Sequence, residues 1–213
     1  MIAKDGMPVL AVTGILTVVM FLLYWLFPNT IMLVVLCLAL FLFVFSLFFL
    51  RDPDRETPSG ENLIISPADG TVIKVDQVEE TDYFAGKVQR VSIFMSVFNV
   101  HVNRVPVSGI VDYLEYEKGK FLAAFADDAS DHNERSIIGI SSARGKILFK
   151  QIAGLIARRI VFNLNKSDSV VAGERFGLIR YGSRVDIYMP LTAKIHVKLK
   201  DKVQSGKTII GEF

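Results

Sequence analysis

The stretch Glu174-Arg-Phe-Gly-Leu-Ile-Arg-Tyr-Gly-Ser-Arg-Val-Asp-Ile-Tyr-Met189 places one Gly-Ser bond between two apolar, strand-like runs. The second run alternates apolar and polar side chains, which is typical of a β-strand. Glycine at 182 leaves its carbonyl open to approach and permits unusual backbone angles. Ser183 follows directly, and a serine held against its own preceding carbonyl can attack it. The stretch therefore predicts two strands with a reactive Gly182-Ser183 junction between them.

Residues 61–213 predict one compact, mainly β domain around that junction. Short alternating segments rich in β-branched and aromatic residues favour strands. These segments are 70–75, 88–94, 107–116, 137–140, 147–152, 184–188 and 193–199. Residues 155–162 fit either a short helix or a strand, and the polar residues 121–135 predict a loop with a helical turn. We expect a β-sandwich or barrel-like domain, and an α+β chain once the N-terminal helices described below are counted.

A weak internal repeat supports this fold class. Asp168-Ser-Val-Val-Ala-Gly173 and Asp201-Lys-Val-Gln-Ser-Gly206 share the pattern Asp-x-Val-x-x-Gly. In each, a turn-forming Asp and a Gly flank a short apolar step, as in a tight β-hairpin. These hairpins resemble those of biotinyl and lipoyl carrier barrels. They also suit ordinary hairpins of an all-β domain, and so short a motif leaves both interpretations open.

The N-terminus predicts a membrane anchor. Residues 9–27 and 31–50 are two uncharged apolar runs, separated by Pro28-Asn29-Thr30. Each has about the ~20 residues that a helix needs to cross a bilayer. A secretory signal peptide would have an apolar region of only ~7–15 residues. We therefore expect a transmembrane helical hairpin over residues 1–50, followed by a polar linker rich in Pro and Gly over residues 51–60.

The charges around the two runs predict which way the hairpin points. Lys4 precedes the first run, Arg51 and Arg55 follow the second, and the turn between them is uncharged. The positive-inside rule then places both ends in the cytoplasm, with the anchor in the cell (inner) membrane. The single cysteine, Cys37, excludes a disulfide framework within the chain. The net charge is +2, and the sequence shows no clustered basic stripe of the kind that binds nucleic acid.

Three further segments carry a resemblance to a known family. They are Ser66-Pro-Ala-Asp-Gly70, Phe94-Met-Ser-Val-Phe-Asn-Val-His-Val-Asn-Arg-Val-Pro-Val-Ser-Gly109 and Gln151-Ile-Ala-Gly-Leu-Ile-Ala-Arg-Arg159. Together with residues 174–189, they resemble the short-form branch of the phosphatidylserine decarboxylases in their order along the chain and in their residues. The resemblance covers essentially all of residues 60–213.

The resemblance implies a proenzyme that cleaves itself between Gly182 and Ser183. Residues 1–182 would become the large subunit, and residues 183–213 the small one. Ser183 would become a pyruvoyl group, a covalent cofactor whose ketone forms a Schiff base with the substrate amine. Such a group accepts electrons as CO2 leaves. The implied reaction converts the membrane lipid phosphatidylserine to phosphatidylethanolamine in phospholipid biosynthesis.

The resemblance also assigns roles to single residues. His101 is the candidate for proton transfer, since its ordinary pKa suits that work near pH 7. Asp69 resembles the acidic member of the self-cleavage triad, although Asp is common in such turns for local hydrogen bonding alone. The longer branch reads His-x-x-His-x-Pro, whereas this chain has Arg104 at the second histidine. An always-charged arginine is a poor proton acceptor, so the base that activates Ser183 stays open.

Arginines of the same region are expected to bind the anionic headgroup. Arg104, Arg180 and Arg184 are the candidates, with Arg158 and Arg159 near them in the motifs. His132 lies in a polar run and His196 alternates with apolar residues on an expected strand, so both fit the surface. No His, Cys or Asp spacing suggests a metal site.

Two rival functions stay open. A pyruvoyl decarboxylase for a small soluble amino acid would use the same junction but would not need the anchor. A membrane-tethered β-barrel adaptor like the biotinyl and lipoyl carriers would do no chemistry at all. The oligomeric state, including a homo-oligomer, and the acyl-chain preference are not set by the sequence.

Overall fold

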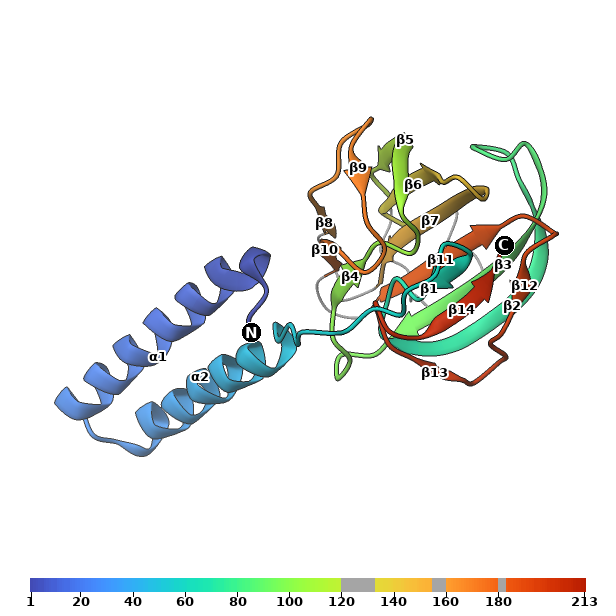
Figure 1. Cartoon of the computed structure of the whole chain (residues 1–213). Helices are drawn as coiled ribbons and strands as arrows, with labels where there is room; N and C mark the ends of the chain where they lie inside the picture. The colour runs from blue at the N-terminus through green and yellow to red at the C-terminus, as the bar shows by residue number, and fades with distance from the viewer. Residues whose placement is uncertain (120–132, 155–159, 180–182) are drawn as a thin grey trace. The chain divides into compact units, whose positions relative to one another are not determined.

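The computed structural model describes residues 1–119, 133–154, 160–179 and 183–213 (Figure 1). The chain divides into two compact units, Met1–Asp54 and Arg55–Phe213, and each is described by itself. The division falls inside the predicted linker. From Arg55 on, the chain packs with the second unit: a Cβ added at Gly173 would lie only 1.9 Å from the Thr57 hydroxyl oxygen.

The first unit is a hairpin of two apolar helices. Its elements are η1 (Lys4–Gly6), α1 (Met7–Leu26) and α2 (Thr30–Phe49). The Asn29 side chain caps α2 by accepting a 3.0 Å hydrogen bond from the Met32 amide. The Thr17 hydroxyl donates to the Ala39 carbonyl of the other helix at 3.2 Å. Both helices are long and apolar enough to cross a membrane, so the predicted hairpin is confirmed and its spanning of a bilayer stays a prediction.

The second unit is built of strands. In chain order they are β1 (Leu63–Ile65), β2 (Gly70–Glu80), β3 (Gly86–Met95), β4 (Val102–Arg104), β5 (Gly109–Glu117), β6 (Arg135–Ser141), β7 (Lys146–Ala153), β8 (Ile160–Phe162), β9 (Ser169–Val170), β10 (Arg175–Ile179), β11 (Ser183–Met189), β12 (Lys194–Ile195), β13 (Lys202–Val203) and β14 (Ile209–Glu212). In the described part of the chain they form one curled eight-stranded sheet and two three-stranded sheets, and Figure 1 shows their arrangement. The prediction of a mainly β domain behind a helical hairpin is confirmed.

The strand order shows that the domain is an internal duplication. The large sheet runs β13-β2-β3-β11-β7-β6-β5-β9, and the small sheets run β1-β14-β12 and β4-β10-β8. One half, which we name half A, consists of β1 to β3 and β11 to β14; half B consists of β4 to β10. Each half gives four strands to the large sheet and forms one small sheet. The chain is continuous through half B, which is inserted between β3 and β11 of half A.

The backbone hydrogen bonds repeat from half to half. In half A the Val72 amide donates to the Asp201 carbonyl at 2.9 Å, and in half B the Val111 amide donates to the Asp168 carbonyl at the same distance. A β-bulge follows directly in β2 and in β5. Bulges bend and twist a strand. The equivalent bulges in β2 and β5 therefore account for the bend of the large sheet next to both of its edge strands.

The two Asp-x-Val-x-x-Gly segments lie at equivalent places in this duplication. Each begins with a carboxylate that accepts a hydrogen bond from a backbone amide three residues earlier: Asn165 for Asp168, at 2.7 Å, and Lys198 for Asp201, at 2.9 Å. Each supplies a two-residue edge strand, β9 or β13. Each ends on a glycine in the left-handed region, with φ of +86° and +70°, where a side chain would be strained. The repeat seen in the sequence is therefore the same turn used twice.

The main core lies on one face of the large sheet. Along β11, Val185, Ile187 and Met189 point into that core. The alternate residues point to the other face, where Tyr188 joins a smaller cluster. Since successive side chains of a strand alternate, Ser183 shares the face of Val185.

Most predicted strands are confirmed with shifted ends. The prediction of one strand over 193–199 is wrong beyond β12, because the chain turns where the Lys198 amide binds the Asp201 side chain. In the ambiguous segment 155–162, residues 160–162 are a strand. Residues 155–159 and 120–132 lie outside the described residues, and with them lie His132 and residues 121–132 of the predicted loop 121–135.

Candidate active site

Ser183 begins β11 in the middle of the large sheet. It pairs with Met95 of β3 on one side and Ala153 of β7 on the other, so three of the four quoted segments meet there. The residue is fully buried, and its hydroxyl donates to the Met95 sulfur at 3.3 Å. A thioether is a weak acceptor, so this contact fixes the direction of the hydroxyl without holding its proton strongly. Gly182 lies outside the described residues.

The duplication shows what is special about this position. In half B, the equivalents of β3 and β11 are β6 and β7, which the tight turn 142–145 joins: the Ser142 amide donates to the Gly145 carbonyl at 2.9 Å. Arg184 pairs with β3 as Lys146 pairs with β6, which makes Gly145 the equivalent of Ser183. The serine therefore stands where the chain re-enters half A after crossing half B.

His101 is held beside the segment that leads to the junction. The imidazole is fully buried, and its Nδ1 lies 3.0 Å from the Asn99 carbonyl oxygen. A carbonyl only accepts, so Nδ1 carries the hydrogen and Nε2 is the basic nitrogen of the neutral ring. The His101 carbonyl accepts from the amide of Ile179 at 3.4 Å, as the Asn62 carbonyl accepts from Phe213 in the other half. Asn62 is thus the equivalent of His101.

Asp69 is buried in a clamp. Its carboxylate accepts from both terminal nitrogens of Arg55, at 2.5 Å and 2.9 Å, and from the Ser205 amide at 2.8 Å. At the equivalent place the Ser108 hydroxyl accepts from the Ala172 amide at 3.0 Å. Accepting from that amide is therefore common to both copies of the turn. The negative charge and its arginine are particular to the copy near Ser183.

A cavity of about 400 Å³ lies at the place equivalent to the Ser183 site. Its lining includes Ser108, Ala172 and residues 142–144. Ser108 corresponds to Asp69, Ala172 corresponds to Ser205, and residue 142 corresponds to the last residue of β3. We name this place the Gly145 counterpart. Its strands and backbone hydrogen bonds are arranged as at the Ser183 site, but its side chains differ.

The sequence of this chain matches known proteins along most of its length. A family model described as phosphatidylserine decarboxylase matches residues 42–211. The phosphatidylserine decarboxylase proenzyme of Syntrophus aciditrophicus is 46% identical over 213 residues, covering 100% of this chain and 97% of the relative. The proenzymes of Cytophaga hutchinsonii and Geobacter sulfurreducens are each 44% identical, covering 95% and 99% of this chain and 93% and 95% of the relatives.

The chain belongs to the phosphatidylserine decarboxylase family. It is accordingly a decarboxylase, a carbon-carbon lyase, which favours the enzyme over the non-enzymatic adaptor. The resemblance inferred from four short segments is confirmed over the full chain.

The arginines of this decarboxylase that were expected to bind substrate lie in different surroundings. Arg104 is 4% exposed, and its Nη1 donates to the Gly173 carbonyl at 3.0 Å. Its Cδ lies against Gly206, where an added Cβ would come within 2.5 Å. Arg104 thus binds the glycine of one Asp-x-Val-x-x-Gly turn and packs on the glycine of the other. Arg158, Arg159 and Arg180 lie outside the described residues.

Arg184 occupies the other face of β11 from Ser183. It is fully buried, and its guanidinium forms an ion pair with Asp186, also fully buried, at 2.9 Å. A buried arginine on the face away from the serine and already paired with a carboxylate suits a structural role. The predicted role of Arg184 in substrate binding stays a prediction.

A buried chain of amides near Ser183 was missed from the sequence. The Asn103 amide nitrogen donates to the Pro67 carbonyl at 3.3 Å and lies 3.8 Å from the Met95 sulfur. Gln151 donates to the Asn103 oxygen at 2.8 Å, and the Ser136 hydroxyl donates to Gln151 at 2.7 Å. The chain links the segments around residues 66, 95 and 151. In the sequence, Gln151 indicated this chain of amides, because it is a polar residue at an inward position of an apolar strand.

Among the residues that the structure describes, no group of three or more His, Cys, Asp or Glu side chains is placed to hold a metal ion. His196 lies near the surface, with its Nε2 3.3 Å from a Glu212 oxygen.

Proposed function

We propose that this chain is a membrane-bound proenzyme that cleaves itself between Gly182 and Ser183 and then decarboxylates phosphatidylserine with the pyruvoyl group that Ser183 becomes. The observation that carries the proposal is the fully buried Ser183 hydroxyl, held by Met95 at the point where the family's segments converge. Membership of a family whose relatives are named proenzymes supports it.

The self-cleavage step needs only the chain and one water molecule. The Ser183 oxygen attacks the Gly182 carbonyl carbon, and the bond from that carbon to the Ser183 nitrogen breaks, which leaves an ester and a free amine. Removal of the Ser183 α-proton then breaks the Cβ–O bond, which releases residues 1–182 as a carboxylate and leaves dehydroalanine. Tautomerisation and hydrolysis give the ketone and ammonia.

The surroundings of Ser183 fit the group that this chemistry would produce. The serine oxygen leaves with Gly182, and the β-carbon becomes a methyl group. A strong hydrogen-bond partner of the hydroxyl would then be left buried and unsatisfied, at a cost of about 1–3 kcal/mol. The Met95 thioether accepts weakly from a hydroxyl and also packs well against a methyl group. The contact therefore suits both the precursor and the cleaved enzyme.

His101 is our candidate for proton transfer in both stages. Arg104 is always charged and donates to Gly173, so it is unsuited to take the Ser183 proton. His101 has its basic Nε2 set by the bond from Nδ1 to Asn99, and it lies at the segment that enters the junction. In the mature reaction the pyruvoyl group supplies an electron sink for decarboxylation. His101, once its Nε2 has taken up a proton, then donates that proton to the substrate carbon that has lost CO2.

Asp69 would act on the site through the turn that it holds. Both of its oxygens accept from Arg55, and one also accepts from Ser205, so the carboxylate fixes the small-subunit turn to the large subunit. Residues 183–213 would stay bound after cleavage in the same way. β11 pairs with β3 on one side and β7 on the other along most of its length.

The two apolar helices support a site of action at a membrane. A diacyl lipid stays in its bilayer, so an anchored enzyme meets it at high local concentration. The positive-inside pattern of Lys4, Arg51 and Arg55 supports a cytoplasmic domain.

Intact mass measurement of the purified full chain tests the proposal. We expect two pieces, residues 1–182 and a blocked piece beginning at position 183. Ser183→Ala should give one uncut chain, whereas Ser142→Ala, at the Gly145 counterpart, should cleave normally. An active preparation that is one unbroken chain would overturn the proposal. Turnover of a small amino acid in place of phosphatidylserine would instead support the alternative of a pyruvoyl decarboxylase for a soluble substrate.

A further inference from the structure

The turn between β3 and β4 presents an exposed aromatic side chain at its tip. Phe98 is 68% exposed. The turn that carries it is rigid: the Asn99 side-chain oxygen accepts from the Ser96 amide at 2.9 Å and from the Ser96 hydroxyl at 2.8 Å. The Asn99 amide closes the turn by donating to the Ser96 carbonyl at 2.9 Å. A ring this exposed on a hydrogen-bonded turn is available for contact with a surface outside the domain.

This turn is directly attached to the residues of the proposed site. Met95, which receives the Ser183 hydroxyl, precedes it, and His101, whose ring binds the Asn99 carbonyl, follows it. Phe98 therefore marks the end of the large sheet at which the substrate must arrive.

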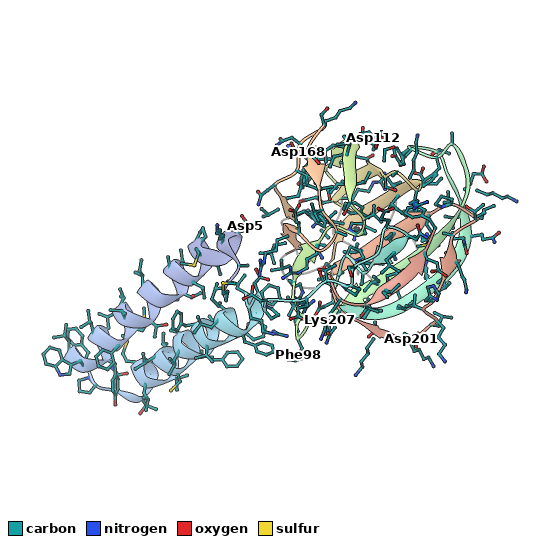
Figure 2. The ribbon with its side chains drawn as sticks, in the orientation of Figure 1. Asp5, Phe98, Asp112, Asp168, Asp201 and Lys207 are labelled. Atoms are coloured by element: carbon teal, nitrogen blue, oxygen red, sulfur yellow. The ribbon has the colours of Figure 1, made fainter. Side chains whose placement is uncertain are left out.

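A cation leaves the sheet at the same end. β3 and β13 both run toward the end that holds Ser183: Val203 pairs with Gly70 at the start of β2, and Phe94 pairs with Thr71. The turn after β13 carries Lys207, which is exposed, and Figure 2 labels it together with Phe98. In half B, Glu174 corresponds to Thr208: its carbonyl accepts from the Val105 amide as the Thr208 carbonyl accepts from Ser66, and its side chain accepts from the Val171 amide as the Thr208 hydroxyl accepts from Gln204. Lys207 is therefore an additional residue of the turn at the Ser183 end.

We propose that Phe98 enters the interfacial layer of a phospholipid bilayer, with Lys207 near the anionic headgroups. This is a second membrane contact, separate from the helical hairpin. Aromatic rings prefer the level of the headgroups, and a nearby Lys is drawn to anionic lipid. The contact rests on the proposed function, because a lipid headgroup must reach Ser183 while its acyl chains stay in the bilayer. A rigid turn beside Ser183 would set the depth at which the domain meets the membrane.

Fluorescence provides a direct test. The chain has one tryptophan, Trp25, so Phe98→Trp in a Trp25→Phe background reports on the turn alone. The matched control is Leu191→Trp in the same background. Leu191 is 48% exposed and lies beyond Met189, at the opposite end of β11 from Ser183. Both full-length variants are placed in vesicles of phosphatidylcholine and phosphatidylserine, with and without lipids brominated at the upper part of the acyl chain.

We expect the Phe98→Trp emission to shift to the blue and to lose about half its intensity to brominated lipid, as a ring at interfacial depth would. The Leu191→Trp emission should stay that of a ring in water. Equal, unquenched emission from both variants would overturn the proposal. Quenching of both to the same extent would also overturn it, because the contact would not be specific to the Ser183 end.

Kinetics gives a second readout. Phe98→Ser should raise the surface fraction of phosphatidylserine needed for half-maximal turnover by about five-fold, because apolar area is lost from the interface. Turnover of a dispersed short-chain phosphatidylserine should be unchanged, and Leu191→Ser should change neither. Intact mass shows separately whether each variant has cleaved itself. Cleaved and active enzyme with unquenched Phe98→Trp emission would overturn the membrane contact alone, whereas active but uncut chain would overturn the proposed function.

Discussion

The Ser183 site and the Gly145 counterpart use one backbone frame with different side chains. Where the first has Ser183 on β11, the second has Gly145 in a tight turn before β7. His101 corresponds to Asn62, and Asp69 to Ser108. Hydrogen bonds found in both places, such as the one to the amide of Ser205 or Ala172, belong to the fold. What differs between them is the candidate chemistry.

The connection between strands differs as well. β6 and β7 are consecutive, so the turn 142–145 must be tight. β3 and β11 are separated by all of half B, so the chain enters β11 from another part of the domain. Breaking the backbone before Ser183 would leave β11 paired on both sides. The interruption of half A therefore supplies a place where the chain can be cut without loss of the sheet.

The largest expected effect tests His101 against its equivalent. His101→Gln should lower turnover of phosphatidylserine about 10²–10⁴-fold, because a general acid is lost. Asn62→Ala should leave turnover within about two-fold, since a residue remote from the chemistry contributes little. Rates on vesicles, corrected for the cleaved fraction, measure both. Equal losses in the two variants would mean that His101 has only the backbone role of Asn62.

The next effect concerns the ion pair on the far face of β11. Asp186 and Arg184 correspond to Leu148 and Lys146 in half B. Asp186→Leu takes this carboxylate away from the buried Arg184 guanidinium and should destabilise the uncut Ser183→Ala chain by about 3–5 kcal/mol. Thermal unfolding in detergent measures it.

Arg184→Met combined with Asp186→Leu is the matched control for that pair. It should recover most of the lost stability, because the buried arginine charge is removed together with its carboxylate. A double variant that is stable but no longer binds phosphatidylserine would support the predicted role of Arg184 in substrate binding.

A smaller effect separates the two roles of Asp69. Asp69→Ser copies Ser108, so the Ser205 amide keeps an acceptor while the ion pair with Arg55 is lost. We expect self-cleavage to slow about ten-fold, which is about 1.4 kcal/mol in the barrier. A gel time course of freshly synthesised chain measures the rate. Cleavage at the normal rate would mean that Asp69 only holds its turn, as Ser108 does in half B.

The smallest effect concerns Met95. Met95→Leu keeps the volume and removes the acceptor of the Ser183 hydroxyl, so stability should change by less than about 1.5 kcal/mol. Cleavage should slow about two- to five-fold, as expected for the loss of one weak hydrogen bond. Turnover per cleaved molecule should be unchanged, because the serine oxygen is absent from the mature enzyme. A fall in turnover per cleaved molecule would contradict this separation of the two stages.

Much of the fold followed from local patterns. Alternation predicted most strands of the large sheet, and run length predicted both helices, because each signal is confined to one element. The repeated Asp-x-Val-x-x-Gly turn was visible, but not the duplication of the whole domain. The remaining equivalences lie in register and backbone bonding, as with Val72 and Val111, rather than in residue identity.

The site was predictable in its parts and not in its contacts. The family resemblance pointed to Ser183, His101 and Asp69 before any geometry was known. It gave no sign that Arg55, assigned to the linker, binds Asp69, or that Arg184 is buried with Asp186. Such pairs are formed by burial, which removes alternative partners, and a local sequence pattern does not report burial of charged residues.

By itself the sequence determined the apolar hairpin, the strand content and the Gly182-Ser183 junction, because those depend on residues adjacent along the chain. The tertiary structure alone decided that Met95 receives the Ser183 hydroxyl, that Gln151 reaches Asn103, and that Arg55 reaches Asp69. These partners meet only when strands distant in sequence pair in one register. That register is set by burying one face of every strand at once, so it is a property of the whole domain.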